Sequence, residues 1–389
     1  MKVYFKNLDG IRFFAAFMVV VHHSFFFKRG YSDASPFVEG CFEHTGRLGV
    51  NLFFILSGFL ISYLLLVEKD STGTISYRSF YMRRILRIWP LYLGYGLVLT
   101  FFSPYVAQKL GLGGETDWGT MILNMVFLLL FAVNFQLAFV GENRGIFEVS
   151  WSVCIEEQFY LIWPPLVNIF RKRLGVLLAG MFILSFLGRL LLYYILPQYR
   201  APVPSNQYLN INYLMLLDKL DLFGGGLFIA VLYYNYKQGR YQSLFKRLFH
   251  PGIQWVMTLL ALGYTISLVK PDSMLYLMFG DHYVCDVLFG YVLLAAVQEN
   301  SIYRLEHPLL KVLGKISFGI YLFHTAICQF VLVFLKKFVG HPQSHILYDI
   351  IYPLLNTLIT CSIAYLSYTY YERWFLLRKK KFELVTTRM

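Results

Sequence analysis

Long apolar stretches alternate with short polar connections along the whole chain. A helix needs about 20 mainly apolar residues to cross a hydrocarbon core of about 30 Å, and roughly eleven stretches approach that length. They lie near residues 11–28, 47–67, 88–107, 119–139, 151–170, 174–195, 216–235, 252–269, 281–298, 314–335 and 347–371. The pattern predicts an all-α polytopic membrane protein.

Basic residues in the connections predict how these helices are oriented. Cytoplasmic loops of membrane proteins are enriched in Lys and Arg. The clusters "RRILR", "RKR" and "RKKK" therefore indicate cytoplasmic connections, and Lys2 and Lys6 place the N-terminus on the same side. The segment 196–215 contains a single basic residue and is predicted to lie outside. Both termini are expected in the cytoplasm, with the chain in the plasma (inner) membrane.

These charges do not fit eleven full crossings. They place 103–118 outside and 171–173 inside, yet two apolar stretches lie between them, where an odd number of crossings is required. One stretch is therefore expected to be re-entrant or interfacial, and we expect it to be 119–139. Non-helical backbone at membrane depth is tolerated where it lines a cavity. The prediction is about ten transmembrane helices plus one such segment.

Composition restricts the class of protein further. The chain is 57% hydrophobic and only 15% charged, whereas a soluble domain carries about 25% charged residues. No long polar block interrupts the apolar stretches, so we expect a single transmembrane domain over 1–389 with no appended soluble domain. The net charge of +13 is concentrated in loops next to membrane helices, so we expect contact with membrane lipid and no nucleic-acid partner. The cysteines have no metal-like spacing, and a bond between Cys41 and Cys285 is an alternative to free thiols.

Polar residues inside the apolar stretches are the candidates for chemistry. In "RFFAAFMVVVHHSFFF", eleven helical steps separate Arg12 from His23, which puts them about 20° apart around the helix and about 16 Å apart along it. Arg12 would lie at the inner surface and His23 near mid-membrane, whereas His22 faces about 100° away. Ionisable groups at this depth usually serve a function. The alternative is a histidine bonded to a neighbouring carbonyl for packing.

Further polar residues occur in later stretches. Arg84 and Arg87 share one helix face and suit a phosphate-bearing ligand, or they are ordinary positive-inside charges or lipid headgroup contacts. In "FEVSWSVCIEEQFYLIWPP", Glu156 and Glu157 lie inside a stretch, where a carboxylate can orient a histidine or neutralise an arginine. His324, in "SFGIYLFHT", is another intramembrane histidine. These residues predict an internal polar site that belongs to an enzyme or to a transport path.

Several motifs together resemble the acyltransferase 3 family of membrane acyltransferases. "LDGIRFFAAFMVVVHH" is similar to that family's opening block, in which ten residues separate an arginine and a histidine, and "YRSFYMRRILRIWPLY" to its R-x-x-R block. "SWSVCIEEQFYLIWP" matches its tryptophan–serine–acid block, and "KLDLFGGGLFIA", "ISFGIYLFHT" and "YYERWF" look like later blocks. "GVNLFFILSGFLI" resembles the second block, with Asn51 where the family usually has aspartate. The matches follow the family's order from residue 8 to 375.

The resemblance implies O-acetylation of an extracytoplasmic carbohydrate with cytoplasmic acetyl-CoA (acyl-CoA) as donor and no metal. It implies the following roles for residues of this chain: His23, Glu156 and Glu157 catalytic; Arg12, Arg84 and Arg87 in donor binding; Ser57, Trp151, Ser152 and His324 in substrate binding. His23 would be a general base on the sugar hydroxyl or a transient acyl carrier, and the sequence leaves both open. Either the chain completes the transfer, or it passes the acyl group to a separate extracytoplasmic transferase protein. The rival hypotheses are a transporter or flippase for a sugar or glycolipid, and another membrane-lipid transferase.

Overall fold

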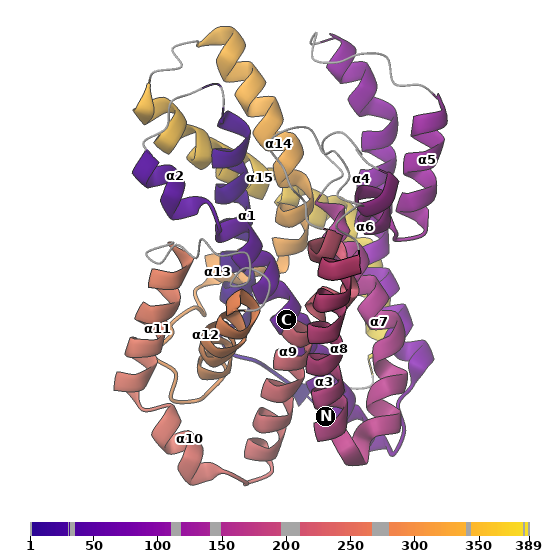
Figure 1. Cartoon of the computed structure of the whole chain (residues 1–389), viewed down its shortest axis with the longest axis vertical. Helices are drawn as coiled ribbons and strands as arrows, with labels where there is room; N and C mark the ends of the chain where they lie inside the picture. Colours follow the sequence, from indigo (N-terminus) through magenta and orange to yellow (C-terminus); the bar gives the residue numbers. More distant parts are fainter. Residues whose placement is uncertain are drawn as a thin grey trace. The chain divides into compact units, whose positions relative to one another are not determined.

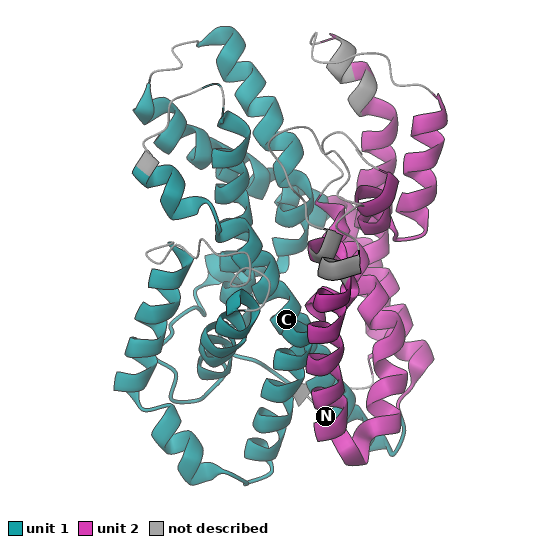
Figure 2. Ribbon diagram, viewed as in Figure 1, with its two compact units in different colours: residues 1–74, 221–369, 385–389 teal, residues 75–220, 370–384 magenta. Residues whose placement is uncertain are grey.

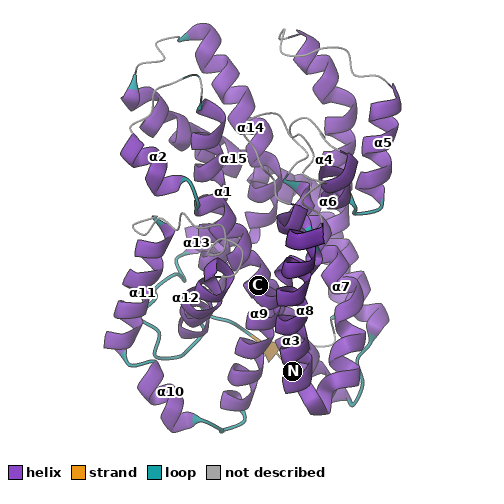
Figure 3. Ribbon diagram, in the orientation of Figure 1, coloured by secondary structure: helices purple, strands orange, loops and turns teal. Residues whose placement is uncertain are grey.

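Helices make up nearly all of the residues that the structure describes (Figure 3). The computed structural model describes residues 2–29, 31, 36–109, 118–140, 149–195, 211–266, 280–339, 344–383 and 386–387. Half of the predicted outer segment 103–118 and most of 196–215 fall outside these residues, and residues 103–109 continue α4. The chain divides into two compact units (Figure 2): residues 1–74, 221–369 and 385–389 form unit 1, and residues 75–220 and 370–384 form unit 2. The expectation of a single domain stays a prediction.

Unit 1 is organised around the first long helix. Its helices are α1 (Leu8–Lys28), α2 (Pro36–Phe42), α3 (Thr45–Thr72), α9 (Leu216–Lys237) from residue 221 onward, α10 (Gln242–Leu248), α11 (Pro251–Thr265), α12 (Asp281–Ala296), α13 (Pro308–Lys315), α14 (Ser317–Phe338) and α15 (Tyr352–Ser367), with a π-helical turn η6 (Ile346–Ile351) before α15. Helix α1 packs against α3, α13, α14 and α15 (Figure 1). A side chain on α1 is therefore positioned from several directions at once.

Small residues let the helices of unit 1 approach closely. A Cβ atom on Gly49 of α3 would collide with the carbonyl oxygen of Ala15 on α1. One on Gly58 would collide with the backbone of Phe223 on α9. Such contacts stabilise membrane helix pairs through dispersion, which needs close surfaces because lipid is as apolar as the side chains. The two glycines of "GVNLFFILSGFLI" thus serve close helix packing, Gly49 against α1 and Gly58 against α9.

The two ends of the chain are hydrogen-bonded to each other within unit 1. Strand β1 (Lys2–Val3) pairs in parallel with strand β2 (Thr386–Thr387), with Lys2 opposite Thr386. At the other end of α1, the ammonium of Lys28 is completely buried and pairs with the carboxylate of Asp349 on η6. An unpaired buried charge would be costly, so this ion pair fixes the end of α1 to the start of α15.

Unit 2 contains the middle of the chain. Its elements are α4 (Tyr77–Lys109), α5 (Trp118–Leu129), α6 (Val133–Phe135), the π-helical turn η1 (Gln136–Val140), α7 (Ser150–Phe170), η2 (Arg171–Arg173), α8 (Leu174–Ile195), η4 (Ile211–Leu214), α16 (Arg373–Lys379) after the turn η7 (Tyr368–Glu372), and η8 (Lys380–Phe382). Helix α4 packs against α5, α7 and α16. The guanidinium of Arg83 donates to the carbonyl oxygen of Phe382 at 2.7 Å, which holds the C-terminal turn against α4.

In the described part of the chain, six helical stretches are long and apolar enough to cross a membrane. They are Leu8–Lys28, Phe37–Thr72, Tyr77–Phe102, Ser150–Leu191, Ser317–Phe338 and Ile346–Phe382. A multi-pass, all-helical membrane protein is therefore confirmed, whereas ten crossings stay a prediction. All five cysteines are free thiols, Cys41 and Cys285 included.

The expected non-crossing segment 119–139 is interrupted. Helix α5 has 12 residues, about 18 Å of rise, which is well short of a ~30 Å core. The helix ends at Leu129, the backbone two residues later at Phe131 is left-handed (φ 51°), and α6 and η1 follow as separate short pieces. A re-entrant or interfacial segment needs such a break, because it must turn within the membrane. The interruption fits a non-crossing segment, and the membrane path of 119–139 stays a prediction.

Candidate functional site

The predicted polar stripe lies on an uninterrupted helix. Helix α1 runs through both Arg12 and His23, so their separation along the axis is the predicted ~16 Å. The side chain of Arg12 is 10% exposed, and its guanidinium lies 3.8 Å from the carboxylate of Asp9, one turn earlier. His23 is half-buried. Both are predicted site residues, and α1 places them along one side of unit 1's central helix.

His23 contacts a second predicted site residue, His324 on α14. Nε2 of His324 lies 3.2 Å from Nδ1 of His23, and the ring centroids are 4.8 Å apart at 64°. Nδ1 of His23 also lies 2.9 Å from the carbonyl oxygen of Val19. Nδ1 of His324 lies 2.5 Å from the carbonyl oxygen of Tyr321. His324 is completely buried, so this pair is part of the interface between α1 and α14.

The neighbouring His22 has different surroundings. Its Nδ1 lies 3.2 Å from the carbonyl oxygen of Phe42, the last residue of α2. The ring also packs against Gly46, because a Cβ there would collide with the imidazole. His22 is therefore held at the corner between α2 and α3, which makes it a natural control for His23.

Unit 2 gathers a separate set of predicted residues around Glu157 on α7. The indole N–H of Trp89 on α4 donates to Oε2 of Glu157 at 2.8 Å. The other carboxylate oxygen, Oε1, is buried and has no hydrogen-bond partner in the part of the chain that the structure describes. Arg84 interacts electrostatically with this carboxylate, and its guanidinium lies 5.8 Å from the ring centre of Tyr160. Nε of Arg84 is likewise buried and unpaired among the described residues.

The remaining predicted residues lie on the same helices. In unit 2, Arg87 is half-buried on α4 and Glu156 half-buried on α7. The indole of Trp151 packs on the ring of Tyr213 with centroids 4.6 Å apart, and the hydroxyl of Ser152 donates to the carbonyl oxygen of Val149 at 3.4 Å. In unit 1, Ser57 is half-buried on α3. The structure thus places His23 in contact with His324, and Arg84 near enough to Glu157 for an electrostatic interaction. The pairing of His23 with a glutamate stays a prediction.

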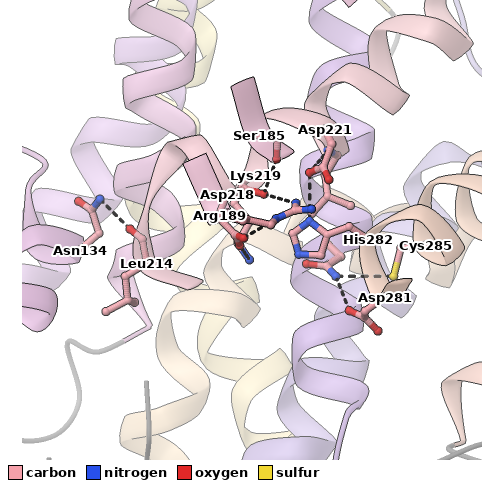
Figure 4. A network of polar contacts seen from close by, with 12 residues as sticks. Asn134, Ser185, Arg189, Leu214, Asp218, Lys219, Asp221, Asp281, His282 and Cys285 are labelled. Atoms are coloured by element: carbon pink, nitrogen blue, oxygen red, sulfur yellow. Dashed lines mark hydrogen bonds and ion pairs between the residues drawn. The ribbon is translucent and has the colours of Figure 1, made fainter. Parts of the chain in front are cut away.

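Sequence reasoning missed several buried polar pairs, most of which appear in Figure 4. In unit 1, Nδ1 of His282 on α12 lies 3.0 Å from the carboxylate of Asp221 on α9. The guanidinium of Arg47 lies 3.2 Å from Asp281, and the amide of Asn51 donates to that carboxylate at 3.4 Å. Asp221 lies in "KLDLFGGGLFIA", one of the motifs that resemble the family, so the sequence did mark this residue. Its partner His282 is 61 positions away, and nothing in the sequence links the two.

Unit 2 contains a comparable pair in which every carboxylate contact is short. The guanidinium of Arg189 on α8 is completely buried and donates from Nε to Oδ1 of Asp218 at 2.7 Å. Lys219 lies 2.6 Å from the other oxygen of the same carboxylate. Figure 4 shows this pair with its dashed contacts. Such a buried, compensated arrangement is typical of a structural ion pair.

Comparisons with known proteins give independent information. A family model described as "Acyltransferase domain", the acyltransferase 3 family, matches residues 5–372. The peptidoglycan O-acetyltransferase OatA of Listeria monocytogenes is 23% identical over 343 residues, which cover 84% of this chain and 50% of the relative. The O-acetyltransferase OatA of Staphylococcus aureus is 24% identical over 396 residues, which cover 98% of this chain and 58% of the relative. This chain therefore spans little more than half the length of these curated relatives. No solved structure matches it.

Proposed function

This chain belongs to the acyltransferase 3 family, and we propose that it is a membrane O-acyltransferase. It transfers an acyl group, acetyl in the simplest case, from cytoplasmic acyl-CoA to a hydroxyl of a cell-surface or exported carbohydrate. The observation that carries this proposal is the family match over residues 5–372, because that range contains every candidate site residue. The two relatives are both named as O-acetyltransferases, which supports the same reaction class.

The donor site is proposed at the arginines. Guanidinium groups bind phosphate oxygens through paired charge-assisted hydrogen bonds, and CoA carries several phosphates. Arg84 and Arg87 share a face of α4, and Nε of Arg84 is buried without a hydrogen bond among the described residues. Arg12, at the start of α1 in unit 1, is also proposed to bind the donor. This arrangement favours an enzyme over the transporter alternative, because a transport path for a neutral sugar needs no phosphate clamp.

His23 is proposed as the group that handles the proton. Its imidazole takes the proton of the sugar hydroxyl, the hydroxyl oxygen attacks the thioester carbon, and the CoA sulfur leaves and takes up that proton. In the alternative route, the imidazole itself first accepts the acyl group. Both routes need an unprotonated ring nitrogen. Glu157, which interacts electrostatically with Arg84, would balance positive charge near the donor. Glu156, on the same helix, is the other carboxylate proposed to orient the imidazole or to neutralise an arginine.

The acceptor is proposed to be a carbohydrate of the cell envelope. The Listeria relative is named for peptidoglycan, which makes an envelope glycan the first acceptor to examine. Ser57 in unit 1, and Trp151 and Ser152 in unit 2, are each proposed to contact the acceptor. The matched relatives are about twice as long as the matched region, so transfer through a separate extracytoplasmic transferase protein is an alternative to direct transfer.

The test is mass spectrometry of the host glycan with the gene deleted and restored. Restoring the wild-type gene should restore O-acetyl groups. His23→Ala should not, with a loss of roughly a hundredfold or more, as is typical when a general base is removed. His22→Ala is the matched control and should retain most activity, because His22 lies at the α2–α3 corner. Unchanged O-acetylation after deletion, or full activity of His23→Ala at normal expression, would refute the proposal.

A further inference from the structure

We infer that His324 is a positioning residue that holds the imidazole of His23 with its Nε2 atom unprotonated and turned to the reacting groups. This inference rests on the proposed function, in which His23 handles the proton. The structural observation behind it is the pair of ring contacts between α1 and α14, together with the two carbonyl oxygens that face the rings.

The tautomer of His324 follows from its backbone contact. A carbonyl oxygen can only accept a hydrogen bond, so the ring nitrogen 2.5 Å from the carbonyl oxygen of Tyr321 must carry the hydrogen. That nitrogen is Nδ1. A neutral imidazole has one N–H group, so Nε2 of His324 is left as an acceptor, and its neighbour is Nδ1 of His23 at 3.2 Å.

The same reasoning then fixes His23. Its Nδ1 faces two acceptors, the carbonyl oxygen of Val19 at 2.9 Å and Nε2 of His324, so Nδ1 carries the hydrogen and shares it between them. Nε2 of His23 is therefore the nitrogen with a lone pair. It makes no hydrogen bond to any residue that the structure describes. That atom is the one that both proposed routes require, as base or as nucleophile.

His324 constrains the His23 ring from a second helix, which the carbonyl of Val19 cannot do. Val19 lies on the same helix, one turn before His23, and constrains the ring from one side only. His324 comes from α14, so its contact also fixes the rotation of the ring across the helix interface. When Nε2 of His23 takes the hydroxyl proton, the ring becomes positively charged, and its Nδ1–H group already points at two acceptors. Hydrogen bonds of this kind are strengthened where the surroundings are apolar.

The arrangement also changes the role expected for His324. Both of its ring nitrogens are engaged within the protein, one by Tyr321 and one by His23, and the residue is completely buried. No ring nitrogen is left for a substrate hydroxyl. A positioning role therefore accounts for His324 better than the substrate contact expected from the sequence.

A pair of amide variants tests the inference. In His324→Gln, the side-chain amide reaches the position of Nε2, where its oxygen can accept the hydrogen bond from His23. In His324→Asn, the shorter amide reaches only the position of Nδ1, so the contact with Tyr321 can persist while that with His23 is lost. The two variants are both polar and differ by one methylene. His324→Leu removes both contacts.

Kinetics of the purified full-length protein in liposomes, with acetyl-CoA and host envelope glycan, give the first readout. We expect kcat to fall roughly 10- to 100-fold in His324→Asn and His324→Leu, the range for losing a group that orients an imidazole. The KM values should stay near wild type, and His324→Gln should recover most of kcat. Wild-type rates in His324→Asn would overturn the inference. Equal defects in Asn and Gln, or a defect mainly in KM, would indicate a structural or substrate-contacting residue instead.

A second readout does not depend on transfer activity. Diethyl pyrocarbonate acylates unprotonated imidazole nitrogens, so wild-type His23 should be modified, as measured by peptide mass spectrometry. The rate of modification should fall in His324→Asn and return in His324→Gln. Absence of modification at wild-type His23, or equal rates in all variants, would overturn the inference. Normal modification combined with an inactive wild-type protein would instead refute the proposed function while leaving the role of His324 intact.

Discussion

At the scale of single residues, unit 2 contains two arginine–carboxylate pairs of different character. Arg189 and Asp218 make short hydrogen bonds and leave both carboxylate oxygens in contact with a cation. Arg84 and Glu157 each leave a buried polar atom without a partner among the described residues. A buried donor or acceptor without a hydrogen bond costs about 1–3 kcal/mol. A protein tolerates that cost most readily where a ligand supplies the missing contacts.

Substituting the arginines of α4 should therefore affect the donor. Arg84→Ala or Arg87→Ala should each weaken acetyl-CoA binding by about 1.5–3 kcal/mol, roughly a ten- to hundredfold rise in Kd, because a charge-assisted contact is lost. Lysine at either position should restore little if the contacts are bidentate. Calorimetry in detergent measures the effect. Arg78→Ala, which removes an exposed charge from the same helix, is the control and should bind normally. Unchanged affinity in the double alanine variant would mean that the pair only sets topology.

The residue pairs also show what the sequence could predict. The Arg12–His23 stripe follows from helical geometry alone, because both residues belong to one helix. The contact between His23 and His324 joins positions 301 apart and depends on how α1 packs on α14. The pair of Asp221 and His282 could not be predicted for the same reason, because it depends on how α9 packs on α12. Local periodicity predicts faces of helices, whereas the partners of those faces are decided by tertiary packing.

At the scale of elements, each of the eleven apolar stretches contains a helix, but their ends and interruptions were less predictable. The left-handed backbone at Phe131, which separates α5 from α6, occurs at a residue with no turn-forming character. A bulky residue adopts this conformation only when surrounding contacts impose it. The stretch 119–139 was set apart by loop charges, and its pattern of apolar residues gave no sign of the break.

Close helix contacts predict different outcomes for two otherwise similar glycine substitutions. A Cβ on Gly226 of α9 would collide with backbone atoms of α3, including Phe59, and backbone cannot move aside. Gly226→Ala should therefore lower stability by about 1–3 kcal/mol, the usual cost of overpacking. Gly180→Ala on α8 meets nothing within 4 Å and should be neutral or gain up to about 1 kcal/mol in helix propensity. Thermal unfolding in detergent compares them, and equal midpoints would contradict close α3–α9 packing.

At the scale of the whole molecule, the length of α1 and one buried ion pair indicate which elements lie at the same membrane surface. Helix α1 has 21 residues and rises about 31 Å, enough to cross the hydrocarbon core. The buried pair of Lys28 and Asp349 puts the far end of α1 at the same level as η6. If the N-terminus is cytoplasmic, η6 lies at the outer surface.

Cysteine labelling in intact cells checks this orientation, with the native cysteines replaced. His345→Cys, at an exposed position just before η6, should react with an impermeant thiol reagent added outside. Lys172→Cys, exposed between α7 and α8, should react only after the membrane is opened, because basic connections face the cytoplasm. The opposite pattern would invert the molecule and place the proposed CoA site outside. Asn143, in the connection before α7 that we expect on the outside, lies outside the described residues.

The short pairing of β1 with β2 restricts the number of times that the chain can cross the membrane. Two strands that share hydrogen bonds cannot be on opposite faces of a bilayer, so a chain that begins at Lys2 and returns to Thr386 must traverse it an even number of times. Eleven crossings are therefore excluded, because eleven is an odd number, whichever side of the membrane the two termini occupy. At least one apolar stretch must turn back or lie flat, and the interrupted stretch that contains α5, a helix of only 12 residues, is our candidate. A four-residue ribbon thereby constrains the membrane path of the entire polypeptide.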